Sequence, residues 1–281
     1  MDRLIVGISQ DKISENDLNN FLEKFKFVPE NAGLVGVERE CFLADSEGNI
    51  AAISPFVLRI LGGPNDSFGP ELASIQLEDR IGPIKISALA GELKEREKFL
   101  ASAEEKFHFK RLFLEVAPTN VPLTVYPDPT GRYQTIVKNL PRHILDAGCR
   151  VAAIHVHVGM KDHETALKVY NKATEHLDEL MSMGDFSSGH RFGLYKMMAP
   201  NWKPRPYRNW RDYCRKAVFE GFYTDPRKCW TLIRISVHGT IEFRMFGSTN
   251  DLKRIVESAK RCLSICGFDD YDGKPLDYNG W

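Results

Sequence analysis

Four short segments of the chain each carry two functional polar side chains two positions apart. They are GVERECF with Glu38 and Glu40, SIQLED with Gln76 and Glu78, AIHVHVG with His155 and His157, and TIEFRMF with Glu242 and Arg244. Side chains at positions i and i+2 of a β-strand point to the same face of a sheet. Each segment therefore predicts a strand with polar groups on one face and apolar residues on the other. Four such strands in one sheet would line a groove with carboxylates, two imidazoles, an amide and a guanidinium.

The chemistry of this side-chain set favours a metal–nucleotide site. Carboxylate and imidazole ligands without cysteine suit Mg²⁺ or Mn²⁺, and an arginine beside them suits a phosphate group. Each motif alone has a simpler interpretation, because Glu242 and Arg244 could form a structural ion pair. In the same way, His155 and His157 could be core histidines. The coincidence of four same-face patterns is what indicates a shared site.

The overall composition is that of a globular enzyme with balanced charge. The 281 residues include 38 Lys and Arg, 38 Asp and Glu, and 43% hydrophobic residues. This balance gives no field that would attract nucleic acid or a membrane surface, which argues against either as the main partner. The six cysteines are scattered without a C-x-x-C pair, and the apolar run at the N-terminus is too short for a signal peptide. These features predict a reduced, cytoplasmic protein without a membrane span.

Helical and strand-like segments mix along the chain without a strict β-α-β alternation. The periodicity predicts helices over residues 14–27, 87–107, 132–147, 162–183, 209–220 and 250–266. It predicts strands over residues 34–44, 75–79, 112–117 and 151–159, a further strand after the turn at 45–49, and a hairpin over 231–246. The segment 185–207 is rich in loop-forming, basic and aromatic residues. Arg191, which follows Ser188 and Gly189 there, is a candidate phosphate or substrate contact.

Neither a G-x-G-x-x-G nor a G-x-x-x-x-G-K-[ST] motif is present, so a Rossmann or P-loop fold is not expected. The pattern predicts an α+β protein with a mainly antiparallel sheet and helices on its outer face. We expect a single catalytic domain over residues 1–281, with a core over about 34–266 and a polar tail over 267–281.

The last hairpin tests the same-face interpretation, because the number of residues in its loop decides which side chains share a face. A two-residue turn would mix the polar and apolar faces, so the loop must have an odd length or contain a bulge. A three-residue loop over 238–240, with Gly239 in the left-handed conformation, would place Arg234 opposite Arg244. Two facing arginines repel unless an anion or carboxylates lie between them, and a phosphate is one candidate for that anion.

The order of these motifs resembles the carboxylate–amine ligases of the glutamate–cysteine ligase type 2 superfamily. The matching motifs are G-V-E-x-E-x-F, a Q-x-E strand, R-Y at Arg132-Tyr133, H-V-H-V-G and T-I-E-F-R-M-F, and the similarity extends over about residues 34–266. The stretch from SSGHRFGLYK to CWTLIRISVHGTIEFRMFG looks most like the phage-associated COOH–NH₂ ligases of that superfamily, which would place the protein in a host cytoplasm.

This resemblance implies the catalytic fold of glutamine synthetase, with a curved sheet lining a catalytic groove. It implies an ATP- and Mg²⁺- or Mn²⁺-dependent ligase that forms an amide through an acyl-phosphate and releases ADP and phosphate. By position, the residues that resemble the family's metal ligands are Glu38, Glu40, Glu78, His155 and Glu242, with Glu71 a further candidate. His157 resembles the nucleotide-phosphate contact, and Gln76 and Arg191 complete the expected cofactor-binding set. Arg234 and Arg244 resemble the phosphoryl clamps, and Glu242 is a further candidate catalytic residue.

The resemblance covers the metal site but not the substrate pocket. The cysteine ligases carry a long small-residue and Asn-Ser-Pro stretch after the helix that follows H-V-H-V-G, whereas residues 181–186 here read MSMGDF. The expected partners are ATP and small-molecule or peptide carboxylates and amines, and a homo-oligomer is compatible with the sequence. Alternatives are a guanidino-kinase-like phosphotransferase, a non-catalytic nucleotide- or metal-binding protein on the same fold, and a metal-dependent hydrolase. The paired arginines and the absence of an H-E-x-x-H motif count against the hydrolase.

Overall fold

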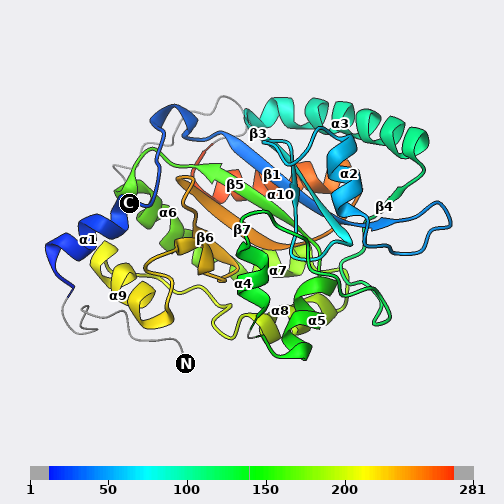
Figure 1. Ribbon diagram of the computed structural model, residues 1–281. Helices are drawn as coiled ribbons and strands as arrows, with labels where there is room; N and C mark the ends of the chain where they lie inside the picture. The colour runs from blue at the N-terminus through cyan, green and yellow to red at the C-terminus, as the bar shows by residue number, and fades with distance from the viewer. Residues whose placement is uncertain (1–12, 139, 269–281) are drawn as a thin grey trace.

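A seven-stranded antiparallel sheet lies at the centre of the protein, as the computed structural model of residues 13–138 and 140–268 shows (Figure 1). The strands are β1 Val35–Ala44, β2 Phe68–Pro70, β3 Gln76–Ile84, β4 Lys110–Leu112, β5 Ala153–Gly159, β6 Ile233–Ile235 and β7 Thr240–Gly247. Their order in the sheet is β2-β3-β1-β5-β7-β6, and β4 pairs with β1 at one end. The predicted α+β class with a mainly antiparallel sheet is confirmed.

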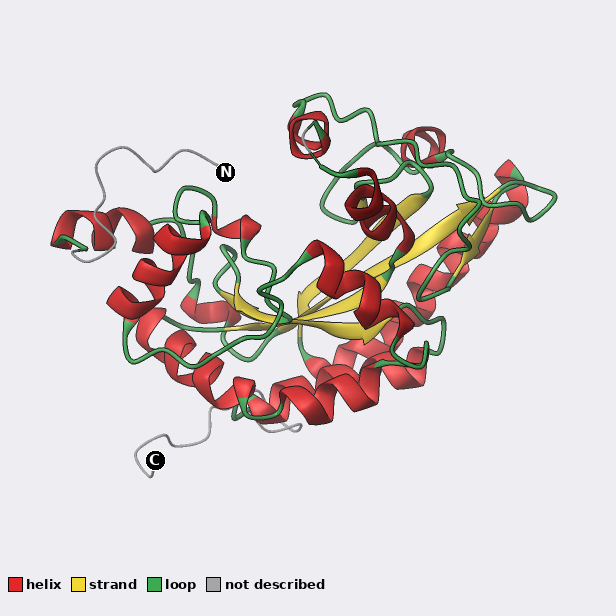
Figure 2. Ribbon diagram, turned by 90° about the horizontal axis from the view of Figure 1, so that it is seen from below, coloured by secondary structure: helices red, strands yellow, loops and turns green. Residues whose placement is uncertain are grey.

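Helices pack on both sides of this sheet. They are α1 Glu15–Leu22, α2 Ser54–Ile60, α3 Ile86–Phe107, α4 Arg132–Val137, α5 Arg142–Arg150, α6 His163–Thr174, α7 Leu177–Gly184, α8 His190–Met198, α9 Trp210–Glu220 and α10 Leu252–Ile265. Short 3₁₀ turns lie at Pro29–Asn31 and Pro226–Lys228. Figure 2 shows helices along one side of the sheet, with shorter helices and loops bordering the other.

The apolar face of the sheet forms the main core with the helices behind it. Val37, Val156 and Phe243 are neighbours across β1, β5 and β7, and all three are fully buried. They belong to one hydrophobic cluster with Leu93 of α3 and Leu263 of α10. Burying an aliphatic or aromatic side chain of this size stabilises the fold by about 1.5–3 kcal/mol. This packing fixes which face of each strand remains for the polar residues.

A buried ionic network lies on the same side as α3 and ties that helix to the sheet. Arg39 of β1 pairs with Asp79 of the adjacent strand β3 and donates to Glu97 of α3 at 2.6 Å. Glu97 also accepts from Arg111 of β4 at 3.0 Å. Buried charges are tolerated only when they are paired in this way. The network therefore connects three strands and one helix directly behind the polar face.

Several predicted element ends are confirmed by their capping contacts. The Ser14 hydroxyl accepts from Asp17 N at the start of α1, and Asp162 accepts from Thr165 N at 2.7 Å at the start of α6. Asn209 caps α9 in the same manner. Such caps satisfy the free N–H groups at a helix start.

Other predicted elements are wrong, in each case for a local reason. Residues 45–49 form the expected turn, but a helix (α2) rather than a strand follows, with Pro55 in its first turn. The strand predicted over 112–117 ends at Leu112, leaving only one isolated bridge further on. The helix predicted over 132–147 is two helices, because Pro141 cannot continue α4 and instead starts α5.

Two further boundaries differ from the prediction in the second half of the chain. The helix expected over 162–183 is interrupted between α6 and α7. The segment 185–207, expected to be loop, contains α8. That helix begins after Gly189, whose φ of +82° follows a turn stabilised by the Asp185 carboxylate. The part of the predicted polar tail over 269–281 lies outside the described residues.

The hairpin of β6 and β7 has the predicted odd loop, one residue earlier than expected. Its loop is 237–239 rather than 238–240, so Arg234 faces Glu242 and the predicted pairing with Arg244 is wrong. Gly239 has a φ of +71°, as expected. The observed register is favourable because it replaces a pair of like charges with an ion pair across the strands.

The sequence predicts reduced cysteines and no membrane-spanning segment. All six cysteines are buried, and Cys262 and Cys266 belong to the main hydrophobic cluster. None of the helices within residues 13–138 and 140–268 combines the length and the hydrophobicity that a bilayer span requires.

Candidate active site

A cavity of about 270 Å³ lies on the polar face of the sheet. It is bordered by residues of α4, α5 and α8 and by the segment before β6. All of the candidate site residues from the sequence line it: Glu38, Glu40, Glu71, Gln76, Glu78, His155, His157, Arg191, Arg234, Glu242 and Arg244. The strand alternation thus brings together side chains that are more than 200 positions apart in the sequence.

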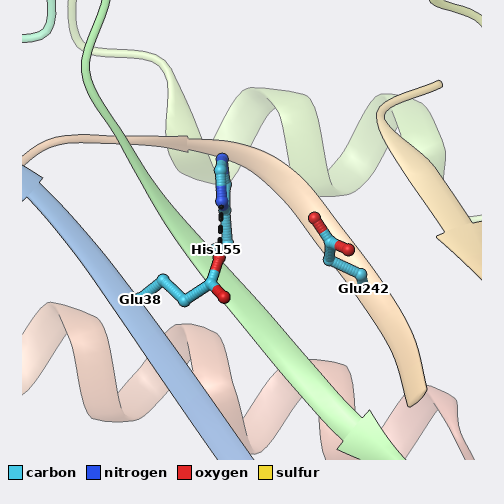
Figure 3. A group of neighbouring side chains, drawn as sticks. All are labelled: Glu38, His155 and Glu242. Atoms are coloured by element: carbon cyan, nitrogen blue, oxygen red, sulfur yellow. Dashed lines mark hydrogen bonds and ion pairs between the residues drawn. The ribbon is translucent and has the colours of Figure 1, made fainter. Parts of the chain in front are cut away.

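Glu38, His155 and Glu242 form one group that could hold a cation (Figure 3). They come from the adjacent strands β1, β5 and β7, and their ligand atoms all lie within 4.8 Å of one another. His155 Nδ1 lies 3.0 Å from Glu38 Oε2. Burial alone would raise the pKa of Glu38, but the neighbouring His157 and His155 outweigh it and hold that pKa well below its usual value.

Glu40, Glu78 and His155 form a second such group within the same distance limit. Glu40 and Glu78 are direct partners across β1 and β3, so two carboxylates face each other. Burial raises the pKa of each to about 7, although Arg244 and Arg191 act against it at Glu40. Like charges placed opposite each other destabilise a sheet unless a cation or a proton lies between them.

Glu71 lies beside this second group, between β2 and β3. Burial and the charges of Glu40 and Glu78 raise the pKa of Glu71 well above its usual value. Its carboxyl group is a third acidic side chain in this part of the cavity wall, and its environment favours the protonated form. The acidic end of the cavity is thus formed by β1, β3 and the residue after β2.

Glu242 is held between two arginines at the opposite end. Arg234 Nε donates to Glu242 Oε2 at 2.6 Å, and Arg244 pairs with the other carboxylate oxygen. Burial would raise the pKa of Glu242, but the two guanidinium groups outweigh it and hold that pKa far below its usual value. Glu242 therefore stays ionised, and the remaining guanidinium N–H groups define a positively charged region next to the first cation group.

His157 lies between the two ends with one ring nitrogen available. Its Nδ1 lies 2.9 Å from Thr240 Oγ1, and its Nε2 lies 3.4 Å from Glu38 Oε1. That buried Nε2 has no hydrogen-bond partner among residues 13–138 and 140–268. Burial would lower the pKa of His157, but Glu38 and Glu242 outweigh it and raise that pKa. For His155 burial prevails, supported by Arg244, and its pKa is lowered.

Gln76 and Arg191 border the cavity with part of their hydrogen-bonding capacity used by the backbone. Gln76 Nε2 donates to Val151 O at 2.7 Å, and its buried Oε1 has no hydrogen-bond partner within the described residues. The Arg191 guanidinium, only 1% exposed, donates to three backbone carbonyls, those of Ala152, Arg244 and Met245. Two of its five N–H groups remain for another partner. Arg191 thus joins the residue before β5 to β7, next to the phosphate-clamp candidate Arg244.

Sequence patterns missed two aromatic residues in the wall of the cavity. The Tyr195 hydroxyl of α8 donates to Trp230 O at 2.9 Å and lies 3.4 Å from Arg244 Nε. The Trp230 ring centre lies 5.6 Å from the Arg244 guanidinium carbon. Neither residue belongs to a strand motif, and the sequence of α8 predicts a loop, so no local signal identifies them.

A second cavity of about 400 Å³ adjoins the first at the starts of β1 and β7. Glu38, Arg80, His157 and His238 line both cavities. Gly36 and Gly159 are among the other residues in the wall of the second cavity. The four shared residues place the two cavities next to each other.

Comparisons with known proteins identify distant relatives of the chain and one solved structure with the same fold. No family model matches the chain. Three similar curated proteins are candidate glutamate–cysteine ligases of type 2. They come from Solibacter usitatus (28% identity over 155 residues, 50% of this chain), Rhodococcus jostii (27% over 182, 61%) and Gloeobacter violaceus (28% over 153, 48%). The chain covers 39%, 47% and 40% of these proteins, respectively, which is less than half of each.

A solved structure shows the same fold across nearly the whole chain. The bifunctional glutathione synthetase from Pasteurella multocida superposes with a TM-score of 0.51 and 15% sequence identity. The match covers 93% of this chain and 41% of that protein. The chain is therefore a distant relative of the glutamate–cysteine ligase type 2 proteins, and it shares its fold with the P. multocida glutathione synthetase.

Proposed function

We propose that this protein is an ATP-dependent, ADP-forming carboxylate–amine ligase. The observation that supports the proposal best is the position of Glu242, which pairs with Arg234 and Arg244 and also belongs to a candidate cation group with Glu38 and His155. One cavity thus combines ligands for a divalent metal with two guanidinium groups, as transfer of a phosphoryl group requires. The distant relation to ligases supports the same reaction class.

The donor set fits Mg²⁺ or Mn²⁺. Buried, facing carboxylates at Glu40 and Glu78 favour a cation between them, and all the nearby donors are carboxylate oxygens or imidazole nitrogens. In this proposal Glu38, His155 and Glu242 would hold one ion, and Glu40 and Glu78 would hold a second. When bound, the metal would neutralise the triphosphate oxygens and withdraw charge from the transferred phosphoryl group.

Arg234 and Arg244 are the proposed phosphoryl clamps. Glu242 fixes both guanidinium groups in place, so their free N–H groups require no reordering when charge develops on the phosphoryl oxygens. His157 is the proposed contact to the nucleotide phosphates, because its Nε2 has no hydrogen-bond partner within the described residues and lies near only Glu38. Gln76 and Arg191 are further candidates on the cofactor side. Each offers a hydrogen-bonding group that the described residues leave unused.

The proposed reaction has two steps. A carboxylate oxygen of the acid bonds to the γ-phosphorus, the bond from that phosphorus to the bridging oxygen breaks, and ADP leaves. The amine nitrogen then bonds to the acyl carbon and loses a proton to solvent, and phosphate leaves. The positively charged end of the cavity would stabilise the first step, because negative charge accumulates on the phosphoryl oxygens there.

Trapping with hydroxylamine tests this proposal, because hydroxylamine takes the place of the amine substrate. The protein is incubated with ATP, Mg²⁺, hydroxylamine and a set of amino acids and peptides, and both ADP and hydroxamate are measured. A ligase yields the two products in equal amounts for at least one acid. A phosphotransferase would yield ADP and a stable phosphorylated product instead, and ADP release that is independent of any acid would contradict both functions.

A further inference from the structure

Trp230 presents a large apolar surface inside the proposed active-site cavity. Its side chain is 45% exposed and lines the cavity, whereas Trp210 is buried in the main hydrophobic cluster. Exposed apolar surface surrounded by polar groups is typical of a ligand-contact site. Met198 and Pro226 contribute further apolar side chains to the same cavity.

The segment that carries Trp230 is held firmly by its backbone. Tyr195 donates to Trp230 O at 2.9 Å. Arg234 Nη1 donates to the carbonyls of Arg227 and Cys229, both at 3.0 Å. The carbonyl of the tryptophan and two carbonyls before it are therefore anchored by residues that themselves line the cavity. The ring is pre-positioned toward the cavity, which lowers the entropic cost of binding a partner against it.

The neighbours of Trp230 identify which part of the reactants lies against it. The ring centre lies 5.6 Å from the guanidinium carbon of Arg244, the proposed clamp on the transferred phosphoryl group. In ATP, a ribose and two phosphates separate the adenine from that phosphoryl group, so adenine cannot reach Trp230 from an extended nucleotide. The carboxylate of the substrate acid accepts the phosphoryl group, so the rest of the acid lies next to Arg244. The side chain of the acid is the part that fits beside the indole.

We infer that Trp230 is a specificity-determining residue that packs against an apolar or aromatic group of the carboxylate substrate. This inference rests on the proposed ligase function and adds the chemical class of the acid. An aromatic ring placed against tryptophan buries a large apolar area and gains a favourable ring–ring contact. The substrate would therefore be an aryl- or alkyl-bearing acid, such as an amino acid or peptide with a large apolar residue beside the reacting carboxylate.

Calorimetry with two simple acids tests the inference. Propionate and 3-phenylpropionate differ only in the phenyl group, and each is titrated into the full protein with Mg²⁺ and ADP present. The wild type is expected to bind 3-phenylpropionate at least about tenfold more tightly than propionate. Trp230→Ala should remove this preference, and Trp230→Phe should keep most of it. Phe219→Ala is the matched control, because Phe219 is 70% exposed on α9 and does not line the cavity.

Each other outcome has a defined meaning. The inference is overturned if the wild type binds the two acids equally or binds neither detectably. It is also overturned if Trp230→Ala keeps the preference for 3-phenylpropionate. A loss of Mg²⁺–ADP affinity in Trp230→Ala as large as the loss for 3-phenylpropionate would assign the ring to the adenine instead. Trp230→Phe keeps the test valid if the alanine variant does not fold. If the wild type shows no Mg²⁺-dependent nucleotide binding at all, the result would instead count against the proposed function.

Discussion

Glu40 and Glu78 face each other directly across β1 and β3, and both side chains are buried. One position along the same two strands, on the opposite face, Arg39 faces Asp79 in a buried ion pair. The repulsive pair in the cavity is thus held in register by an attractive pair behind it. Such an arrangement keeps two carboxylates together where separation would otherwise be favoured. It is the arrangement that a cation site requires.

The facing carboxylates predict an unusual dependence of stability on pH. The pKa of Glu40 and of Glu78 is about 7 in the folded protein, above the value of 4.5 for an unperturbed glutamate. Their protonated forms are favoured in the native state, so their contribution is complete below the unfolded pKa and is lost as pH rises through about 7. Without metal, the free energy of unfolding should fall by roughly 1–3 kcal/mol between about pH 5 and pH 8.

Denaturant unfolding in a chelator at the two pH values measures this change. His155, whose pKa is lowered, acts in the opposite direction, whereas Glu71 and His157, whose pKa values are raised, act in the same direction as the pair. A comparison with Glu40→Gln therefore measures the contribution of the facing carboxylates. The free energy of unfolding of this variant should fall less between the two pH values than that of the wild type, and Mg²⁺ should restore the stability of the wild type at the higher pH. A wild type and a Glu40→Gln variant with the same pH profile would rule out the proposed repulsion.

Removing either phosphoryl clamp should affect turnover more than nucleotide affinity. Arg234→Ala or Arg244→Ala should lower kcat by about 10²-fold or more, because a preorganised donor to the transition state is lost. Lysine should restore little of this rate, since an ammonium group lacks the planar fork of a guanidinium. Turnover is measured by ADP release, and nucleotide affinity by calorimetry.

A control for these variants is available at the protein surface. Arg261 also pairs with a carboxylate, Glu179, but it does so away from the cavity. Arg261→Ala should leave both constants unchanged. If folded Arg234 and Arg244 variants turn over at the wild-type rate, the two arginines have a structural role only.

Tyr195→Phe should lower kcat while leaving the fold intact. Only the hydroxyl group is removed, and with it the hydrogen bond to Trp230 O and the contact with Arg244 Nε. Loss of one such interaction costs about 0.5–1.5 kcal/mol, which corresponds to a few-fold to tenfold lower rate if it acts on the position of Arg244. Equal kcat for both proteins would show that Tyr195 does not position the clamp.

Gly239→Ala should destabilise the hairpin that carries Arg234 and Glu242. Gly239 has a φ of +71°, and a Cβ there would clash with the backbone carbonyl oxygen of Lys26. The strain and the clash should lower the free energy of unfolding by about 2 kcal/mol or more. Gly91→Ala is the matched control within α3, where an added Cβ meets no heavy atom within 4 Å in the described part of the chain. It should be neutral or stabilising by up to about 1 kcal/mol, and equal destabilisation of both variants would contradict this account.

The polar face of the sheet could be predicted because strand alternation is a local property. Glu38 and Glu40, or His155 and His157, reveal their shared face through a spacing of two. Which strands are adjacent, and that Glu38 lies beside His155, depends on long-range pairing that no single segment encodes. The fold class followed from the absence of nucleotide-loop motifs and of regular alternation.

The mispredicted features depend on contacts between different segments of the chain, which the local sequence pattern does not show. The register of the last hairpin is favoured by attraction between Arg234 and Glu242, which loop parity alone does not include. Helix α8 follows a turn built on Asp185, so its glycine-rich start has the composition of a loop. Tyr195 and Trp230 meet only because α8 packs near the segment before β6, and their contact is not visible in the sequence.

The acidic and basic ends of the cavity, in the proposed function, bind ATP together through a divalent metal. Calorimetric titration of a non-hydrolysable ATP analogue, with Mg²⁺ and then with a chelator, tests this most directly. We expect at least about tenfold tighter binding with Mg²⁺, since the buried carboxylates otherwise repel the phosphates. Glu38→Gln should reduce this difference, whereas Glu257→Gln, an exposed glutamate of α10, should not. Equal affinity with and without metal in the wild type would contradict the account.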